Sequence, residues 1–109
     1  MRLEEMKNTP WDVFICYRGS NQLSTAVSGE IYATLTYDKK KKVFFAPRVY
    51  EKDQDFEQYL PDILSRVKVV VLMLSKGFFK GCSNADDVVR KELEEALRHP
   101  QIMFVPIQF

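Results

Sequence analysis

The sequence predicts a three-layer α/β/α domain, in which helices cover both faces of a central parallel sheet. The first observation is the order β-α-β-α-β-α-β, in which short apolar runs alternate with segments of helical periodicity. The second is the run Val67–Leu74, which is apolar after Lys68, as is typical of a strand buried on both faces. The third is length, because 109 residues suffice for one core but not for two.

Each element follows from the hydrophobic periodicity of its segment. Residues 1–10 are polar and charged, so we expect a flexible lead-in before a domain that spans residues 11–109. Pro61 is a defect in the second expected helix, and Pro106 belongs near the end of the last strand because it cannot donate to a ladder. The expected strands are Asp12–Tyr17, Val43–Ala46, Val67–Leu74 and Ile102–Ile107, and the expected helices are Leu23–Tyr37, Phe56–Val67 and Ala85–His99.

The last expected helix, Ala85–His99, contains neither Gly nor Pro and stops at Pro100. Asn84 is a suitable N-cap, and Asp86 and Asp87 then fall in the first turn, where the helix dipole favours anions. These features predict where the helix begins and ends.

Glu92 is the most informative residue of that helix. At about 100° per residue, Glu94 and Glu95 point away from the apolar stripe, whereas Glu92 lies at its edge. Partial burial raises the pKa of a carboxyl group, which can then act as an acid, a base or an ion-stabilising charge. The alternative, which helix geometry alone favours, is a boundary glutamate that pairs with a neighbouring Lys or Arg.

Composition excludes several classes of protein. The net charge of +1 favours neither a nucleic-acid nor a membrane partner. Cys16 and Cys82 lie far apart, and with a single histidine they form neither a disulfide framework nor a metal site. The N-terminus has no apolar segment of a signal peptide, so we expect a cytoplasmic protein.

The predicted topology gathers three loops at one edge of the sheet. In open sheets of this type, ligands bind at the carboxyl ends of the strands, here Tyr17–Asn21, Pro47–Asp55 and Ser75–Asn84. No GxGxxG or GxxxxGK[ST] motif is present, which disfavours a dinucleotide fold of the Rossmann kind and a P-loop. The candidate ligand-binding residues at this edge are Arg18 and Arg48 for phosphate, Tyr17, Phe56 and Phe79 for stacking, and the carboxylate of Glu92.

Five stretches, in order from Trp11 to Phe109, resemble the TIR (Toll/interleukin-1 receptor) domain family. WDVFICYRGS resembles the first-strand motif D-[VI]-F-[IL]-S-[YF]-R, with Cys16 at the serine position. VFFAPRVYEKDQDFEQYLPDIL resembles the second strand, the BB loop and the next helix, and VKVVVLMLSKGFF the third strand with its terminal serine, Ser75. DDVVRKELEEAL resembles the helix that carries the family's glutamate, here Glu92, and IMFVPIQF the following strand. The resemblance implies a flavodoxin-like fold.

The resemblance also implies an activity, with NAD+ as substrate and no further cofactor. In the enzymatic branch of the family, the glutamate at the position of Glu92 serves cleavage of the nicotinamide–ribose bond by an NAD+ glycohydrolase or ADP-ribosyl cyclase, through an oxocarbenium-like state. The implied substrate-binding residues are Tyr17, Arg18, Arg48, Phe56, Ser75 and Phe79. The implied contacts to other TIR domains in a homo-oligomer or filament are Val49, Tyr50, Glu51, Lys52 and Asp53. Bacterial members commonly act in anti-phage defence or innate immune signalling.

Two departures from the family pattern stand out. Val88 and Val89 occupy the region where the family often has Trp and Cys, so we expect Phe78 or Phe79 to supply the missing stacking. The family domain usually continues with another helix and strand, whereas this chain stops at Phe109, as a short variant or as a module of something larger.

Three alternatives remain open. A non-enzymatic TIR adaptor would use the BB loop as a protein contact, and Glu92 would then face no cleft of ligand size. A flavodoxin-like domain for another nucleotide or sugar would have its pocket between the first and third strand ends, without Glu92. A truncated, marginally stable α/β fragment would leave a sheet edge bare.

Overall fold

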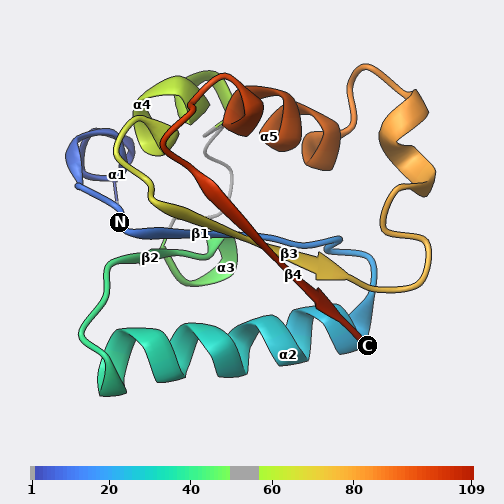
Figure 1. Ribbon diagram of the computed structural model, residues 1–109, viewed down its shortest axis with the longest axis horizontal. Coiled ribbons are helices and arrows are strands. Elements are labelled where there is room, and N and C mark those ends of the chain that lie inside the picture. The colour runs from blue at the N-terminus through green and yellow to red at the C-terminus, as the bar shows by residue number, and fades with distance from the viewer. Residues whose placement is uncertain (1, 50–56) are drawn as a thin grey trace.

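Four parallel strands form one sheet in the computed structural model, which describes residues 2–49 and 57–109. Their spatial order is β2-β1-β3-β4, as Figure 1 shows. Val13 of β1 pairs with Val43 of β2 and with Val69 of β3, and Val69 pairs with Met103 of β4. The strands are β1 (Val13–Cys16), β2 (Val43–Phe44), β3 (Val69–Leu74) and β4 (Met103–Gln108). This confirms the predicted flavodoxin-like fold with a central parallel sheet.

Helices cover both faces of the sheet (Figure 1). The long helix α2 (Gln22–Ala33) crosses one face and continues into a π-helical turn at Thr34–Asp38. The other face carries α4 and α5, with α1 beside α4. The remaining helices are α1 (Leu3–Asn8), α3 (Ala46–Val49), α4 (Leu60–Leu64) and α5 (Val88–Leu97). None of these described helices has the length and apolar content needed to cross a membrane.

The sheet separates two apolar cores. On the α2 face, Ile15, Phe45 and Met73 are buried against Val27 and Ile31. On the opposite face, the rings of Phe14 and Phe44 stack with centroids 5.0 Å apart, and Trp11 meets Phe44 edge-on at 5.3 Å. Because both faces of β1 and β3 are covered, these strands consist almost wholly of apolar residues.

The first ten residues differ from the flexible lead-in that the sequence suggested. Leu3–Asn8 form α1, and Met6 is fully buried in the core beside α4. Trp11 Nε1 donates a hydrogen bond to the carbonyl oxygen of Met6 over 2.8 Å. The apolar residues Leu3 and Met6 lie one turn apart, so they face the same side of this short helix.

Helix α5 begins three residues later than predicted. Its N-cap is Asp87, whose carboxylate accepts from the backbone N–H of Arg90 over 3.1 Å, and not Asn84. Asn84 instead accepts from the N–H of Asp86 over 2.9 Å in the preceding turn. Both residues are favourable caps, and the tertiary contacts of Asp87 described below select it.

The segments on either side of residues 50–56 also differ from prediction. β2 contains only two residues, and Ala46, predicted as its last residue, instead begins α3. In place of one long helix, a 3₁₀ turn at Glu57–Tyr59 leads into α4. Pro61 lies in the first turn of α4, where it lacks no helical hydrogen bond and is not a defect.

Pro106 lies within β4, which is an edge strand. The N–H of Met103 donates to the carbonyl of Lys68 over 2.8 Å, toward β3. The side of the strand toward which the backbone N–H groups point alternates from residue to residue. The nitrogen of Pro106, three residues after Met103, therefore faces the open edge of the sheet, where no donor is needed.

Candidate functional site

Glu92 lies on the face of α5 that packs toward the sheet. Val89 and Ala96, one turn before and after it, are 3% and 1% exposed and belong to the core. Glu92 itself is only 7% exposed, so it is buried more deeply than the half-withdrawn position predicted for it.

The thiol of Cys16 is the hydrogen-bond partner of Glu92. Cys16 ends β1 and is fully buried, and its Sγ donates to Glu92 Oε1 over 3.3 Å. Burial raises the pKa of the Cys16 thiol well above its ordinary value, and the Glu92 carboxylate raises it further. Cys16 is therefore a protonated donor and not a nucleophilic thiolate.

Burial also controls the ionisation of Glu92. Removal from water raises the pKa of its carboxyl group from the ordinary 4.5 to about 8. The charges of Glu57 and Asp87 raise the pKa as well, whereas the Cys16 hydrogen bond and the Arg18 charge lower it. At neutral pH the carboxyl group is thus mostly protonated, and a nearby cation would favour its ionised form.

Glu92 opens onto a hollow of about 420 Å³ at the carboxyl ends of the strands, which we call the Glu92 hollow. It brings together Glu92 with Tyr17 and Arg18, two of the predicted substrate-binding residues. Its charged and acidic groups are the carboxyl groups of Glu57, Asp87 and Glu92 and the guanidinium of Arg18. The full lining is Tyr17, Arg18, Gly19, Ser20, Ala46, Glu57, Asp87, Val88, Val89 and Glu92.

Arg18 is held in an ion pair with Asp87, the N-cap of α5. Besides the direct contact of its Nη1 with Asp87 Oδ1, its Nη2 lies 3.2 Å from Oδ2. Its Nε donates to the carbonyl of Phe78 over 3.2 Å. Hydrogen bonding in this pair raises the pKa of Arg18 and lowers that of Asp87. Arg18 therefore joins the loops after β1 and β3 to α5, in addition to lining the hollow.

Arg48 lies away from the Glu92 hollow. Its guanidinium carbon sits 5.8 Å from the ring centroid of Tyr32, a cation–π contact on α2. It lines a different hollow, together with Glu5 and Trp11. The structure does not bring Arg48 together with Glu92.

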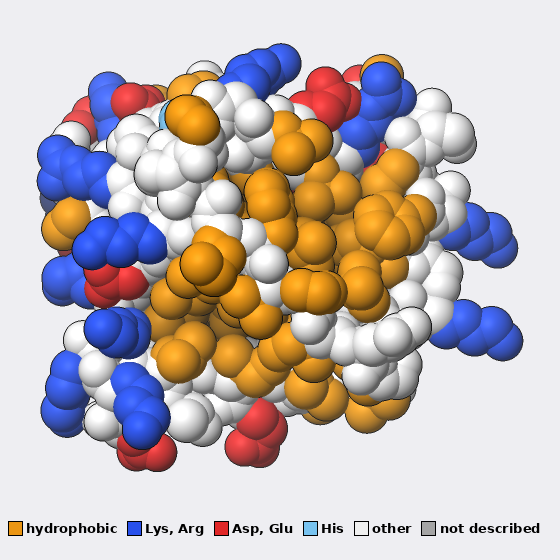
Figure 2. Space-filling view, in the orientation of Figure 1, with side chains coloured by type: hydrophobic (Ala, Val, Ile, Leu, Met, Phe, Trp, Pro, Cys, Tyr) orange, Lys and Arg blue, Asp and Glu red, His pale blue; other side chains and the backbone are white. Residues whose placement is uncertain are grey.

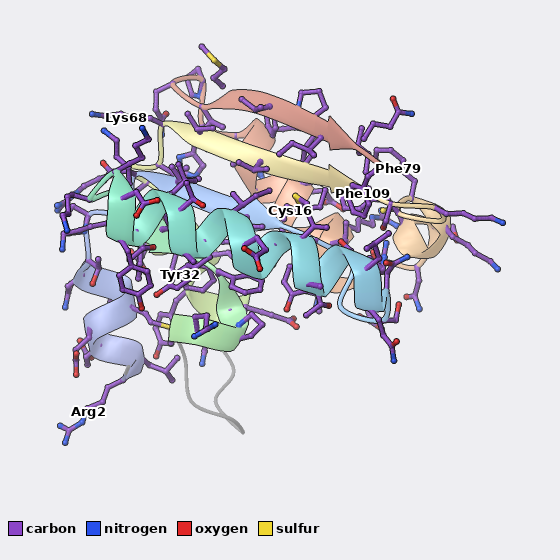
Figure 3. The ribbon with its side chains drawn as sticks, turned by 90° about the horizontal axis from the view of Figure 1, so that it is seen from below. Arg2, Cys16, Tyr32, Lys68, Phe79 and Phe109 are labelled. Carbon is purple, nitrogen blue, oxygen red and sulfur yellow. The ribbon has the colours of Figure 1, made fainter. Side chains whose placement is uncertain are left out.

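Ser75 and Phe79 line a separate hollow of about 360 Å³ and not the Glu92 hollow. The hydroxyl of Ser75 is buried and has no hydrogen-bond partner in the described part of the chain. Phe79 is 59% exposed and lies at the end of the sheet toward which the arrows of β3 and β4 point (Figure 3). Phe78, the other residue expected to supply stacking, is buried in the core.

The remaining predicted residues cannot be placed around the site. Phe56 and the expected assembly contacts Tyr50, Glu51, Lys52 and Asp53 lie outside the described residues. Val49 is the last residue of α3.

Glu95 was expected to point to solvent and is instead buried. Its carboxylate lies 2.9 Å from Arg98 Nη1 and 2.8 Å from His99 Nε2. Apolar periodicity missed it because the Arg98 cation and the His99 ring, at the end of the helix, supply partners for the buried carboxylate.

Sequence reasoning also missed Glu57 and the ion-pairing role of Asp87. Glu57 lines the Glu92 hollow, and its Oε2 forms an ion pair with Lys91 Nζ over 2.9 Å. The signal for Asp87 was its position directly before Val88 and Val89, which suits an N-cap. Nothing in the local sequence around Glu57 indicated its proximity to α5.

Comparison with known protein families and with curated proteins finds no match for this chain. Among residues 2–49 and 57–109, no cluster of three or more His, Cys, Asp or Glu side chains is arranged to hold a metal ion.

Proposed function

We propose that this chain cleaves the nicotinamide–ribose bond of NAD+, as its resemblance to TIR domains implies. The observation that supports the proposal is Glu92, a buried carboxyl group beside a thiol donor in a hollow at the carboxyl ends of the strands. A buried glutamate with a strongly raised pKa in such a cleft is a candidate functional group on physical grounds alone.

In the proposed reaction, the bond between the ribose C1′ and the nicotinamide N1 breaks, and its electron pair goes to the nitrogen. Nicotinamide leaves as a neutral molecule, and positive charge develops on the ribose. The Glu92 carboxylate stabilises this oxocarbenium-like state. Attack by water on C1′ then yields ADP-ribose and releases one proton, whereas attack by a group of the substrate itself yields a cyclic product.

The proposal requires Glu92 to be ionised when the substrate is bound. The pyridinium ring of NAD+ carries a positive charge, and an opposite charge within a few ångströms favours the carboxylate. Within the Glu92 hollow, Asp87 already pairs with Arg18 and Glu57 with Lys91, so Glu92 is the acidic group that we propose to face this cation. The substrate itself therefore helps to convert the neutral carboxyl group into the charged form that catalysis needs.

The resemblance further suggests activation by assembly with other TIR domains and a role in bacterial anti-phage defence or innate immune signalling. We include both in the proposal, with residues 49–53 as the contacts between neighbouring copies.

The test is NAD+ consumption by the purified chain over a wide range of concentrations, with chromatography of the products. Glu92→Gln keeps the shape of the side chain and should abolish nicotinamide release. Glu94→Gln is the matched control, because Glu94 lies on the same helix but is half exposed and pairs with Arg90. Activity of Glu92→Gln equal to that of the wild type would refute the assignment of Glu92.

A second candidate is a non-enzymatic interaction domain, favoured by one observation. Apolar side chains gather over the front of the molecule, where Figure 1 places β4 (Figure 2). Met103 is 65% exposed, Phe109 41% and Val105 37%. Exposed apolar patches of this kind often mark protein contacts. If concentrated wild-type chain leaves NAD+ intact but associates, and Met103→Ser reduces the association, this candidate takes precedence.

A further inference from the structure

The two central strands, β1 and β3, diverge at their carboxyl ends. The chain leaves β1 for α2 on one face of the sheet, and it leaves β3 for α5 on the other face (Figure 1). In a sheet of order β2-β1-β3-β4, this is the point where the strand order reverses. Crevices at such points are the usual ligand sites of open parallel sheets, and flavodoxin-like proteins bind a phosphorylated cofactor there.

A hollow of about 530 Å³ lies at this point, and we call it the switch-point hollow. The loops after β1 and β3 supply all of its lining, which is Arg18, Ser20, Asn21, Lys76, Gly77, Lys80 and Gly81. Arg18 and Ser20 also line the Glu92 hollow, so the two hollows adjoin.

The switch-point hollow has a positive character of its own. Two exposed lysines, Lys76 and Lys80, line the switch-point hollow, and no described carboxylate does. The side-chain ammonium group of neither lysine makes an ion pair or hydrogen bond with the described part of the chain. The charge of Arg18, by contrast, is offset by Asp87. The two lysines thus make the switch-point hollow suitable for an anion.

The backbone of the switch-point hollow is accessible as well. Gly77 adopts a positive φ of 77°, and neither Gly77 nor Gly81 has a side chain that would keep a ligand from the backbone. Asn21 caps the N-terminus of α2, which opens at the same place and adds a partial positive charge. Phosphate groups are commonly bound by such a combination of lysines, backbone and helix terminus.

We propose that the switch-point hollow binds the phosphate groups of a nucleotide whose ribose lies in the adjoining Glu92 hollow, with Lys76 and Lys80 as the phosphate-binding cations. The placement of the ribose beside Glu92 rests on the proposed function. The phosphate site in turn specifies the class of substrate. The chain takes a nucleotide with a diphosphate, and a nucleoside that lacks phosphate binds weakly.

The test compares ADP with adenosine, which differ only in the diphosphate, by titration calorimetry and by amide NMR of the wild-type chain. ADP should bind at least about tenfold more tightly than adenosine. Its binding should weaken as salt rises. The amide signals of Gly77 and Gly81 should shift, and those of Glu5 and Thr9, which line a distant hollow, should not.

The variant is the double substitution Lys76→Gln and Lys80→Gln, and its matched control is Lys39→Gln with Lys68→Gln. All four lysines are exposed, so both doubles should fold and both lower the net charge by two. The first double should weaken ADP binding about tenfold and leave adenosine binding unchanged. The control double should change neither.

Equal loss of ADP affinity in both doubles would show only a general charge effect and overturn the proposal, as would ADP binding no tighter than adenosine binding. The outcome is independent of the proposed cleavage reaction. If ADP binds as expected but Glu92→Gln and wild type both leave NAD+ intact, the phosphate site stands and the proposed activity fails.

Discussion

Cys16 and Glu92 share a buried hydrogen bond, with 3.3 Å between Sγ and Oε1. Cys16 comes from the end of β1 and Glu92 from the second turn of α5, so the contact joins the central strand to the helix that covers it. A thiol is a weak donor, so it offsets only part of the free energy that ionised Glu92 loses on leaving water. The consequence is a carboxyl group whose pKa lies at about 8.

Glu92→Gln should stabilise the fold at alkaline pH. The pKa of Glu92 is about 8 in the folded chain and near the ordinary 4.5 when unfolded, so the folded state binds the extra proton between these values. The contribution of the Glu92 carboxyl group to stability should therefore be fully present below pH 4.5 and be lost as pH rises to about 8. Relative to Glu92→Gln, the loss should be on the order of 2 to 4 kcal/mol. Urea denaturation at pH 5 and pH 9 measures it, and Glu94→Gln, half exposed, should show no such difference.

Substitution of Cys16 should move the pH dependence of catalysis. Cys16→Ala removes the donor and should raise the pKa of Glu92 further, whereas Cys16→Ser supplies a stronger donor and should lower it. We expect shifts of about half to one pKa unit in opposite directions. The pH profile of kcat/KM for NAD+ cleavage and a carbon-13 NMR titration of the Glu92 carboxyl group both report it. Cys82→Ala is the control, and shifts of the same sign in the Ala and Ser variants would contradict the prediction.

Asp87 has two roles that two substitutions separate. Asp87→Asn keeps an oxygen that caps α5 but loses the charge that pairs with Arg18, whereas Asp87→Ala loses both. Asn should lower the free energy of unfolding by about 1 kcal/mol for the ion pair. Ala should lower it by about 1 kcal/mol more for the cap. Chemical denaturation at pH 7 measures both, and equal losses in the two variants would mean that the ion pair contributes everything.

We predict that an added methyl group changes stability in opposite directions at Gly81 and at Gly29. A Cβ at Gly81 would lie 3.0 Å from Arg18 Nη1 and 3.0 Å from Asp87 Oδ1, so Gly81→Ala should push the ion pair apart and destabilise the chain. A Cβ at Gly29, within α2, would meet nothing within 4 Å. Gly29→Ala should stabilise the chain by about 0.5 to 1 kcal/mol through helix propensity. Thermal denaturation of the two variants gives the signs directly.

Met6 tests whether α1 is part of the folded core. Met6 is fully buried, so Met6→Ala should cost about 2 to 5 kcal/mol. Met103→Ala is the matched control, because Met103 is 65% exposed and the same change should cost less than about 0.5 kcal/mol. Equal denaturation midpoints for both variants would mean that residues 1–10 are the flexible lead-in that their polarity suggests.

The alternation of strands and helices was readable from the sequence because it depends on local periodicity. The run around β3 is apolar on both faces since its strand lies between two neighbours and beneath helices on both sides, so its central, parallel position could be predicted. Glu92 stood out for a similar reason, because the spacing of Val89 and Ala96 defines the buried side of α5.

Contacts between residues that are distant in the chain were decided only by the tertiary structure. Cys16 and Glu92 are 76 residues apart, and Arg18 and Asp87 are 69 apart. The second pair selects Asp87 over Asn84 as the cap of α5, although both residue types cap helices well. Burial of Met6 likewise places α1 against the core, where packing of Met6 and Leu3 offsets the cost of ordering a short helix. Local propensities leave such choices nearly equal in free energy, and packing between distant segments then determines the outcome.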